Sequence, residues 1–195
     1  MEMRTMQIKA PKVREDNGKR YLEGYFAVFD EPYNVYNGWV ETVARGAFAR
    51  YLATGEDVKV LWNHDANLVL GSTGNSTATL MEDERGLWGS VEINPGDTDA
   101  LNALARVERG DVTGCSFGFE IARQEEWWDD DGVYHTRIIE VDPLYEVSPC
   151  TFPAYRATSI AARSRETLED AKKRRNALWK KNMLKRMKGE IQDGT

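Results

Sequence analysis

Short segments rich in β-branched and aromatic residues recur along the first 140 residues, and Gly, Asn, Asp or Pro bounds each of them. This pattern is typical of β-strands joined by tight turns. It predicts strands over residues 21–29, 58–62, 78–82, 86–93 and 113–122.

A run of Asp-Asp-Asp-Gly at 129–132 separates two further strand-like segments, 124–128 and 134–139. Asp-Gly is a favoured sequence for the tight turn of a β-hairpin, because glycine adopts positive φ without steric cost. The spacing therefore predicts a long hairpin.

Two helices are expected within this part of the chain, over 46–53 and 98–109. In the second, Asp97 or Thr98 is a suitable N-cap and Gly110 a suitable stop. Many short strands with only two internal helices predict a mainly β (α+β) fold, a closed or nearly closed antiparallel β-barrel with helices packed outside it.

The charge distribution divides the chain. Residues 163–195 carry 11 Lys and Arg against 5 Asp and Glu, a net +6, which leaves −12 for residues 1–162. We therefore expect a barrel domain over 1–162 and a basic, mostly helical tail over 163–195. The acidic body would repel nucleic acid, so the basic tail is not interpreted as a nucleic-acid site.

The tail lacks Gly and Pro from 165 to 188 and is rich in Ala, Leu, Lys, Arg and Glu, which predicts one long helix. Leu168 and Ala171 begin an apolar stripe, and Trp179, Met183 and Met187 continue one. The helix is expected either to pack on its own body or to dock on a partner or a second copy.

Composition argues against several classes of protein, namely membrane-spanning, disulfide-rich and zinc-binding proteins. The chain starts without an apolar signal run, and no stretch approaches the roughly 18 apolar residues that a membrane span needs, so a soluble intracellular protein is expected. Cys115 and Cys150 are too few for a disulfide framework. The histidines, His64 and His135, are 71 positions apart, which argues against a zinc site, and no cofactor is expected.

Scarcity of histidine draws attention to His64, in Asn-His-Asp, and to Ser116, in Gly-Cys-Ser-Phe-Gly-Phe, as a possible base and nucleophile. If 113–122 is a strand, Cys115 and Phe117 share one face and Ser116 the other. Cys115 is then a core residue, which argues against it as a rival nucleophile. From pattern alone, structural roles for Ser116 and His64 stay open.

Six blocks in order resemble the prohead proteases of tailed bacteriophages: 24–29, 41–48, 61–65, 70–71, 109–119 and 144–155. That family is similar in fold to the herpesvirus assemblins, serine peptidases built on an antiparallel barrel. The resemblance implies that Ser116 is the nucleophile and His64 the base of a serine endopeptidase. It implies that the substrate is phage scaffold protein or the scaffolding part of the capsid protein, cut inside the procapsid in the host cytoplasm.

The third catalytic member has to hold the His64 tautomer. Acidic candidates after the hairpin are Glu140, Asp142 and Glu146. Glu146 has an apolar neighbour on each side, which predicts an inward-facing carboxylate that needs a partner. We select Glu146. A structural role for it near Ser148 stays open, and His135 is the alternative because assemblins use a histidine there.

A competing hypothesis is a non-catalytic assembly module, in which the same fold binds scaffold or capsid protein without cutting it. The presence of both His64 and Ser116 favours the protease.

Overall fold

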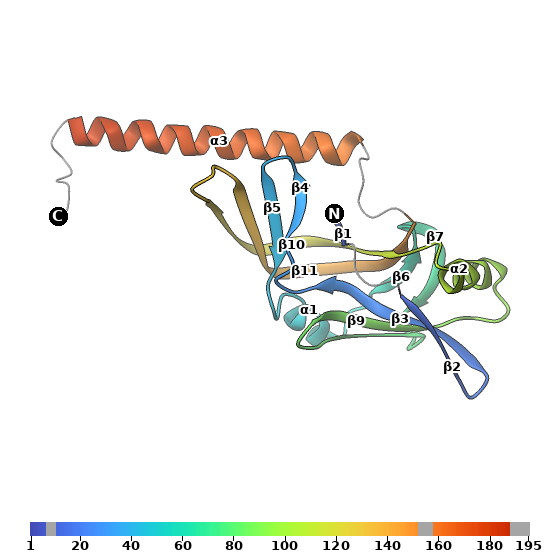
Figure 1. The fold of residues 1–195 in the computed structure, drawn as a ribbon. Helices are drawn as coiled ribbons and strands as arrows, with labels where there is room; N and C mark the ends of the chain where they lie inside the picture. Colours follow the sequence, from blue (N-terminus) through green and yellow to red (C-terminus); the bar gives the residue numbers. More distant parts are fainter. Residues whose placement is uncertain (7–10, 152–157, 188–195) are drawn as a thin grey trace.

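Two β-sheets share one hydrophobic core in the computed structural model, which describes residues 1–6, 11–151 and 158–187 (Figure 1). In the described part, the larger sheet has seven strands: β1 (Glu2–Met6), β10 (Gly114–Trp128), β11 (Tyr134–Cys150), β5 (Trp39–Val43), β4 (Tyr33–Tyr36), β6 (Lys59–Trp62) and β7 (Asp65–Ser72). The smaller has four: β2 (Lys12–Asp16), β3 (Lys19–Val28), β9 (Gly86–Glu92) and β8 (Ala78–Glu82).

Strands β10 and β11 form the predicted hairpin and are the longest strands described. They pair antiparallel from Gly114 opposite Cys150 to Trp128 opposite Tyr134. At the turn, Gly132 has φ of 76°, and the Val133 N–H donates to Asp129 Oδ1 at 2.8 Å. The Asp-Gly chemistry therefore acts as expected, and the segments predicted at 113–122 and 124–128 are one continuous strand.

The closed or nearly closed barrel is not confirmed, because the strands form two separate sheets. Strand β11 changes partner along its length: Tyr134 to Ile138 pair with β5, whereas Glu146 and Val147 pair with β6. Both of these pairings are parallel, so the larger sheet is mixed rather than antiparallel. Because β11 pairs with β5 over one part of its length and with β6 over another, the larger sheet divides into two branches and does not close into a barrel.

Strand parity in β10 agrees with the sequence pattern. Cys115, Phe117 and Phe119 are fully buried in the core cluster. The Phe117 ring packs edge-on against Phe48 at a centroid distance of 5.3 Å and lies 4.7 Å from Phe119. Complete burial of such a side chain contributes about 1.5–3 kcal/mol. This anchoring fixes which face of β10 carries Ser116.

Helix α2 (Thr98–Arg109) has the predicted bounds. Asp97 caps it by accepting from the N–H groups of Asp99 and Ala100, at 2.9 and 3.2 Å, and Gly110 ends it in the left-handed conformation. Helix α1 (Ala49–Thr54) begins three residues later than expected. The reason is Gly46, whose φ of 83° lies outside the helical region.

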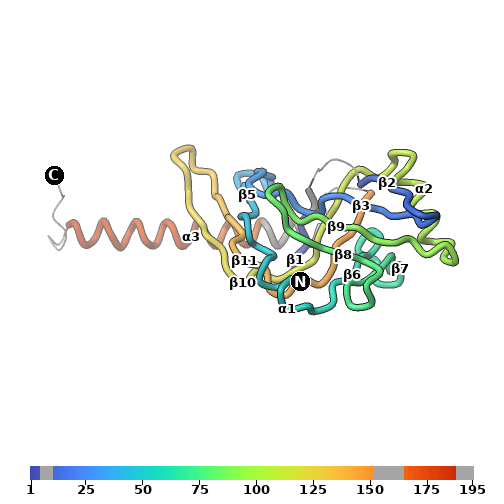
Figure 2. Tube along the Cα trace, turned by 90° about the horizontal axis from the view of Figure 1, so that it is seen from below, coloured from blue at the N-terminus to red at the C-terminus, as the bar shows by residue number. Residues whose placement is uncertain are grey.

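Helix α3 (Thr158–Met187) has two distinct halves. Leu168 and Ala171 are buried against Trp39 and Tyr134, so the predicted packing on the body holds for the first half. The second half projects beyond the body (Figures 1 and 2). Its Trp179 is 61% exposed. Of the predicted helix, Lys188 lies outside the described residues.

None of the helices in the described part of the chain combines the length and apolar character needed to cross a membrane.

Candidate active site

His64 lies in a strained turn between β6 and β7 rather than at a strand end. Asn63 and His64 have φ of 53° and 63°, in the left-handed region that few non-glycine residues adopt. The turn is fastened to β11: the Asn63 N–H donates to the Pro149 carbonyl at 3.1 Å, and the Thr151 N–H donates to Asn63 Oδ1 at 2.8 Å. These bonds direct the His64 side chain toward β11.

The next residue, Asp65, supports this turn from the other side. Its Oδ1 accepts from the backbone and side-chain N–H groups of Asn67, both at 2.9 Å. The Asp65 carboxylate is therefore engaged within its own turn.

Glu146 and His64 are in direct contact. Oε1 of Glu146 lies 2.7 Å from Nδ1 of His64, and the Glu146 side chain is only 5% exposed. A carboxylate accepts hydrogen bonds, so this contact assigns the hydrogen to Nδ1 and leaves Nε2 as the basic nitrogen. Such an imidazole is prepared to receive a proton at Nε2.

Ser148 is a site residue that the sequence reasoning did not select. Its hydroxyl donates to Oε2 of Glu146 at 2.5 Å and accepts from the backbone N–H of His64 at 3.2 Å. Both carboxylate oxygens of Glu146 therefore have partners, as a buried charge requires. The available signal was the i, i+2 spacing of Glu146 and Ser148, which places both on one face of a strand.

Gly118 provides the space for this carboxylate. It pairs with Glu146 across the β10–β11 ladder. A Cβ added at Gly118 would lie 2.5 Å from Glu146 Oε1, well inside contact distance. The glycine that follows Ser116 by two positions thus accommodates the Glu146 carboxylate.

Ser116 lies on the same face of the sheet, directly opposite Ser148 in the ladder. Directly opposed residues have Cβ atoms about 4.5–5.5 Å apart. Ser116 is fully buried, and its hydroxyl donates to the carbonyl oxygen of Arg4 in β1 at 2.9 Å. A hydroxyl carries one hydrogen, so in this arrangement that hydrogen points toward β1.

The alternative site residues have other surroundings. Burial raises the pKa of the Cys115 thiol, which disfavours the thiolate that a nucleophile needs. His135 lies at the hairpin, with Nε2 2.8 Å from Asp129 Oδ2 and its ring stacked on Trp127.

The two other acidic candidates also lie in different surroundings. Glu140 forms an ion pair with Arg50. Asp142 is exposed.

Among the described residues, no group of three or more His, Cys, Asp or Glu side chains is arranged to hold a metal ion. The hydrogen bonds described above join His64, Glu146 and Ser148, and an imidazole held in this way can accept a proton at Nε2.

Comparisons with known proteins agree with the resemblance seen in the sequence. A family described as caudovirus prohead serine protease has a sequence model that matches residues 5–174. The prohead protease of Enterobacteria phage HK97 is 32% identical over 155 residues, 77% of this chain and 63% of that protein. This chain therefore spans less than two thirds of that relative's length.

Among solved structures, the capsid assembly protease of bacteriophage T4 aligns with a TM-score of 0.41 and 13% identity, covering 76% of this chain and 96% of that one. The match of the family model extends over most of the chain. The chain therefore belongs to the caudovirus prohead serine protease family.

Proposed function

We propose that this chain is a serine endopeptidase with Ser116 as nucleophile, His64 as general base and Glu146 as the group that orients His64. The observation that carries the proposal is the 2.7 Å contact between His64 Nδ1 and Glu146 Oε1, on the face of the sheet that Ser116 shares. The orienting carboxylate, the imidazole and the serine are the three parts of an activated-nucleophile site.

In this mechanism the Ser116 hydroxyl leaves the Arg4 carbonyl oxygen and turns toward His64. Nε2 accepts the proton as Oγ attacks the peptide carbonyl carbon. The proton then passes to the departing amine, the C–N bond breaks, and an acyl ester on Ser116 remains. Water, deprotonated by the same Nε2, hydrolyses the ester and restores the serine. Proton transfer of this kind contributes about 10²–10⁴-fold.

The proposed substrate is scaffold protein, or the scaffolding segment of the capsid protein, cut within the assembling procapsid in the host cytoplasm. Membership of the prohead protease family supports this substrate class. The likeness to a phage prohead protease over 77% of the chain supports it further.

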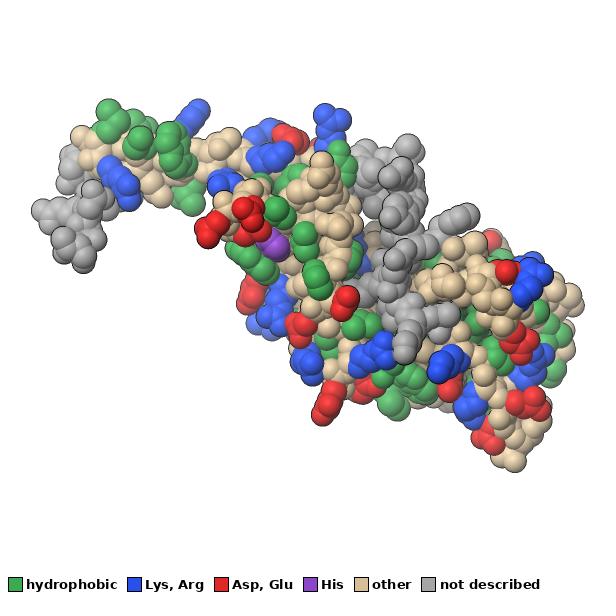
Figure 3. All heavy atoms as spheres, viewed as in Figure 1, with side chains coloured by type: hydrophobic (Ala, Val, Ile, Leu, Met, Phe, Trp, Pro, Cys, Tyr) green, Lys and Arg blue, Asp and Glu red, His purple; other side chains and the backbone are tan. Residues whose placement is uncertain are grey.

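We also propose that the projecting half of α3 binds an acidic amphipathic segment of an assembly partner. Leu178, Trp179 and Met187 are 60%, 61% and 79% exposed there. Figure 3 shows hydrophobic side chains gathered at this end of the helix. Residues 178–187 include four Lys and Arg and no Asp or Glu. Such a face complements an acidic helix better than a second basic copy.

Replacing Trp179 and Met187 together by Ser tests the docking surface. We expect the protein to keep its fold, since both side chains are exposed, and to lose incorporation into proheads. Unchanged incorporation would exclude this surface. Loss of a dimer in sedimentation experiments on the isolated protein would assign the surface to self-association instead.

The second candidate function is a non-catalytic assembly module. The burial of Ser116 and its bond to the Arg4 carbonyl oxygen favour this candidate, because a nucleophile has to meet its substrate. Co-expression with the capsid or scaffold protein of the same phage separates the two. The protease predicts fragments with the wild-type chain and none with Ser116→Ala. Fragments that persist with Ser116→Ala exclude the serine mechanism, and intact proteins with both chains favour the module.

A further inference from the structure

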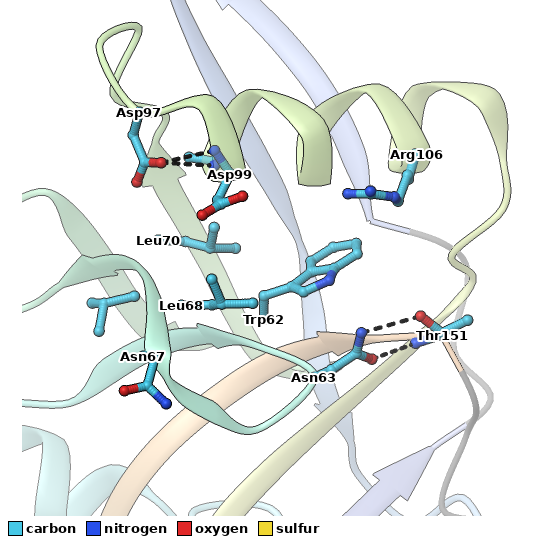
Figure 4. Close-up of a pocket in the computed structure, with 11 residues that line it drawn as sticks. Trp62, Asn63, Asn67, Leu68, Leu70, Asp97, Asp99, Arg106 and Thr151 are labelled. Carbon is cyan, nitrogen blue, oxygen red and sulfur yellow. Dashed lines mark hydrogen bonds between the residues drawn. The ribbon is translucent and has the colours of Figure 1, made fainter.

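A pocket of about 580 Å³ lies beside the proposed catalytic residues (Figure 4). Asn63, which directly precedes His64, forms part of its wall together with Thr151, and the two side chains are hydrogen-bonded at 3.2 Å. A peptide whose scissile bond reaches His64 therefore passes this pocket with a neighbouring residue.

The pocket combines an apolar surface with charged groups from α2. Trp62, Leu68 and Leu70 contribute the apolar part. Figure 4 shows the Arg106 guanidinium above Trp62, on the side of Asn63 and Thr151, whereas Asp99 lies at the other end of the helix. A side chain that contacts both the apolar surface and Arg106 needs methylene groups followed by a polar group at its end.

Arg106 differs from the other arginines of residues 1–151. Eight of them form an ion pair with a carboxylate, and a ninth, Arg85, lies over the Tyr25 ring at 4.5 Å. Among the described residues, Arg106 has neither kind of partner. A guanidinium offers five N–H donors in a planar fork that matches a carboxylate, and in the pocket these donors are available.

The acidic residues of the pocket lie at the N-terminal end of α2. The Asp97 carboxylate accepts from the N–H groups of Asp99 and Ala100, at 2.9 and 3.2 Å. Asp99 lies in the first turn of α2, where the helix dipole stabilises a negative charge. Arg106 is in the last turn, where the dipole favours its charge but engages none of its side-chain donors. Among the described residues, the exposed Asp99 carboxylate has no ion-pair partner either, but it lies at the far end of the helix. The charged group at the end of the pocket near Asn63 and Thr151 is therefore the Arg106 guanidinium, a hydrogen-bond donor.

We propose that this pocket is a specificity subsite that takes an acidic side chain, Asp or Glu, of the peptide substrate. The carboxylate pairs with Arg106, and the methylene groups lie on Leu68 and Trp62. The subsite deepens the proposed protease function and depends on it.

A cleavage-site survey tests the subsite with the full-length chain. Peptides from a chymotryptic digest of a bacterial lysate serve as the probe, because they keep acidic and basic residues at internal positions, and mass spectrometry identifies the residues around each cut. We expect Asp and Glu to be enriched at one fixed position near the scissile bond. A pair of synthetic peptides, with Glu or Gln at that position, then gives kcat/KM values for each variant.

With Arg106→Gln, kcat/KM should fall about tenfold on the Glu peptide and stay unchanged on the Gln peptide, since only the charge-assisted contact is lost. With Arg106→Glu, the enrichment should move to Lys and Arg. Arg109→Gln is the matched control, because Arg109 is on the same helix, pairs with Asp111 and does not line the pocket.

Two outcomes contradict the subsite: cuts by the wild type that show no acidic enrichment, or enrichment that Arg106→Gln leaves intact. With either outcome, the protease proposal is still supported if the wild type cleaves peptides and the Ser116→Ala variant does not. If the Ser116→Ala variant cleaves as fast as the wild type, the serine mechanism is wrong. That result leaves the subsite untouched, because the subsite is judged from the residues found around each cut.

Discussion

His64 Nδ1 and Glu146 Oε1 lie 2.7 Å apart although the residues are 82 positions apart in the chain. The parallel pairing of β6 with the second half of β11 brings them together: Lys59 and Val60 pair with Glu146 and Val147, and His64 lies in the turn that follows β6. The second oxygen of Glu146 is bonded to Ser148, so the carboxylate is held at both ends. This arrangement fixes the orientation of the imidazole.

Glu146→Gln should leave the fold intact and reduce cleavage strongly. The amide has the shape of the carboxylate but lacks its charge, and removal of an orienting acid costs up to about 10⁴-fold in rate in a serine protease. Cleavage of the substrate by the purified variant measures the effect, with circular dichroism as the check on folding. Glu120→Gln is the control, since Glu120 is exposed and bonded to Tyr145. A rate equal to wild type would remove Glu146 from the mechanism.

Gly118→Ala should reduce activity through Glu146. The new methyl group would lie 2.5 Å from Oε1, so the carboxylate has to move away from His64. The double variant Gly118→Ala, Glu146→Gln should then be no slower than Glu146→Gln alone, because two changes that act through one group are not additive. Gly96→Ala, at an exposed site, is the control. Additive losses would show that Gly118 acts independently of Glu146.

Ser148→Ala tests whether Ser148 positions the other residues. The substitution removes the donor to Glu146 Oε2 and the acceptor of the His64 N–H. Loss of comparable supporting bonds around metal ligands lowers activity about 10–100-fold, and we expect a loss of that size here. We expect the loss in kcat, with KM unchanged, because no substrate contact is removed. If KM rises instead while kcat stays at the wild-type value, Ser148 contacts the substrate rather than the catalytic residues.

Local sequence patterns anticipated the features that depend on local chemistry. Asp97 and Gly110 mark the ends of α2, and Asp129 with Gly132 makes the hairpin turn. The alternation in β10 separated Cys115 from Ser116, because side-chain direction in a strand depends only on parity. Each of these features is fixed by a few neighbouring residues.

The remaining features depend on contacts between distant segments. The partner exchange of β11 has no local signature, since its pairing with β5 and then with β6 joins segments that are far apart in the sequence. The left-handed turn at His64 is held by Pro149 and Thr151, and the role of Ser148 depends on that turn. These features are therefore determined by tertiary contacts rather than by the local sequence.

Both cysteines should resist alkylation in the folded protein. Burial, with a smaller effect of Glu146, raises the pKa of Cys150 to about 12, and burial raises that of Cys115 as well. At pH 8 the folded protein then holds almost no thiolate, whereas unfolded cysteine has a pKa of about 8.5.

Iodoacetamide labelling at pH 8, followed by mass spectrometry, measures this reactivity with and without denaturant. Activity should survive the native treatment. Because both thiols have a higher pKa in the folded than in the unfolded protein, they contribute fully to the free energy of unfolding below about pH 8.5. This contribution falls as the pH rises beyond that value, since the unfolded thiols ionise first. Rapid native labelling of Cys115 with loss of cleavage would restore the cysteine as a candidate nucleophile.

The buried pair of Arg4 and Glu41 should be essential to stability. The Arg4 side chain is 8% exposed and that of Glu41 is 0% exposed. Glu41 also accepts from Tyr33 and, at 2.9 Å, from Thr136. Arg4 also pairs with Glu2 at 2.6 Å, but the Glu2 side chain is 49% exposed, so loss of the Glu41 charge leaves the buried guanidinium with only a solvent-screened partner. Loss of one member of a buried pair costs about 3–5 kcal/mol. Glu41→Gln should therefore lower the free energy of unfolding by this amount in a urea titration.

The exposed pair of Arg14 and Glu23 is the control, since Glu23→Gln should cost at most about 1 kcal/mol. The double replacement Arg4→Met, Glu41→Leu removes both charges and should recover much of the loss. Because the Arg4 carbonyl oxygen accepts from the Ser116 hydroxyl, β1 links this buried pair to the proposed nucleophile. A loss below about 1 kcal/mol for Glu41→Gln would mean that the pair is hydrated and that β1 is held by its ladder with β10.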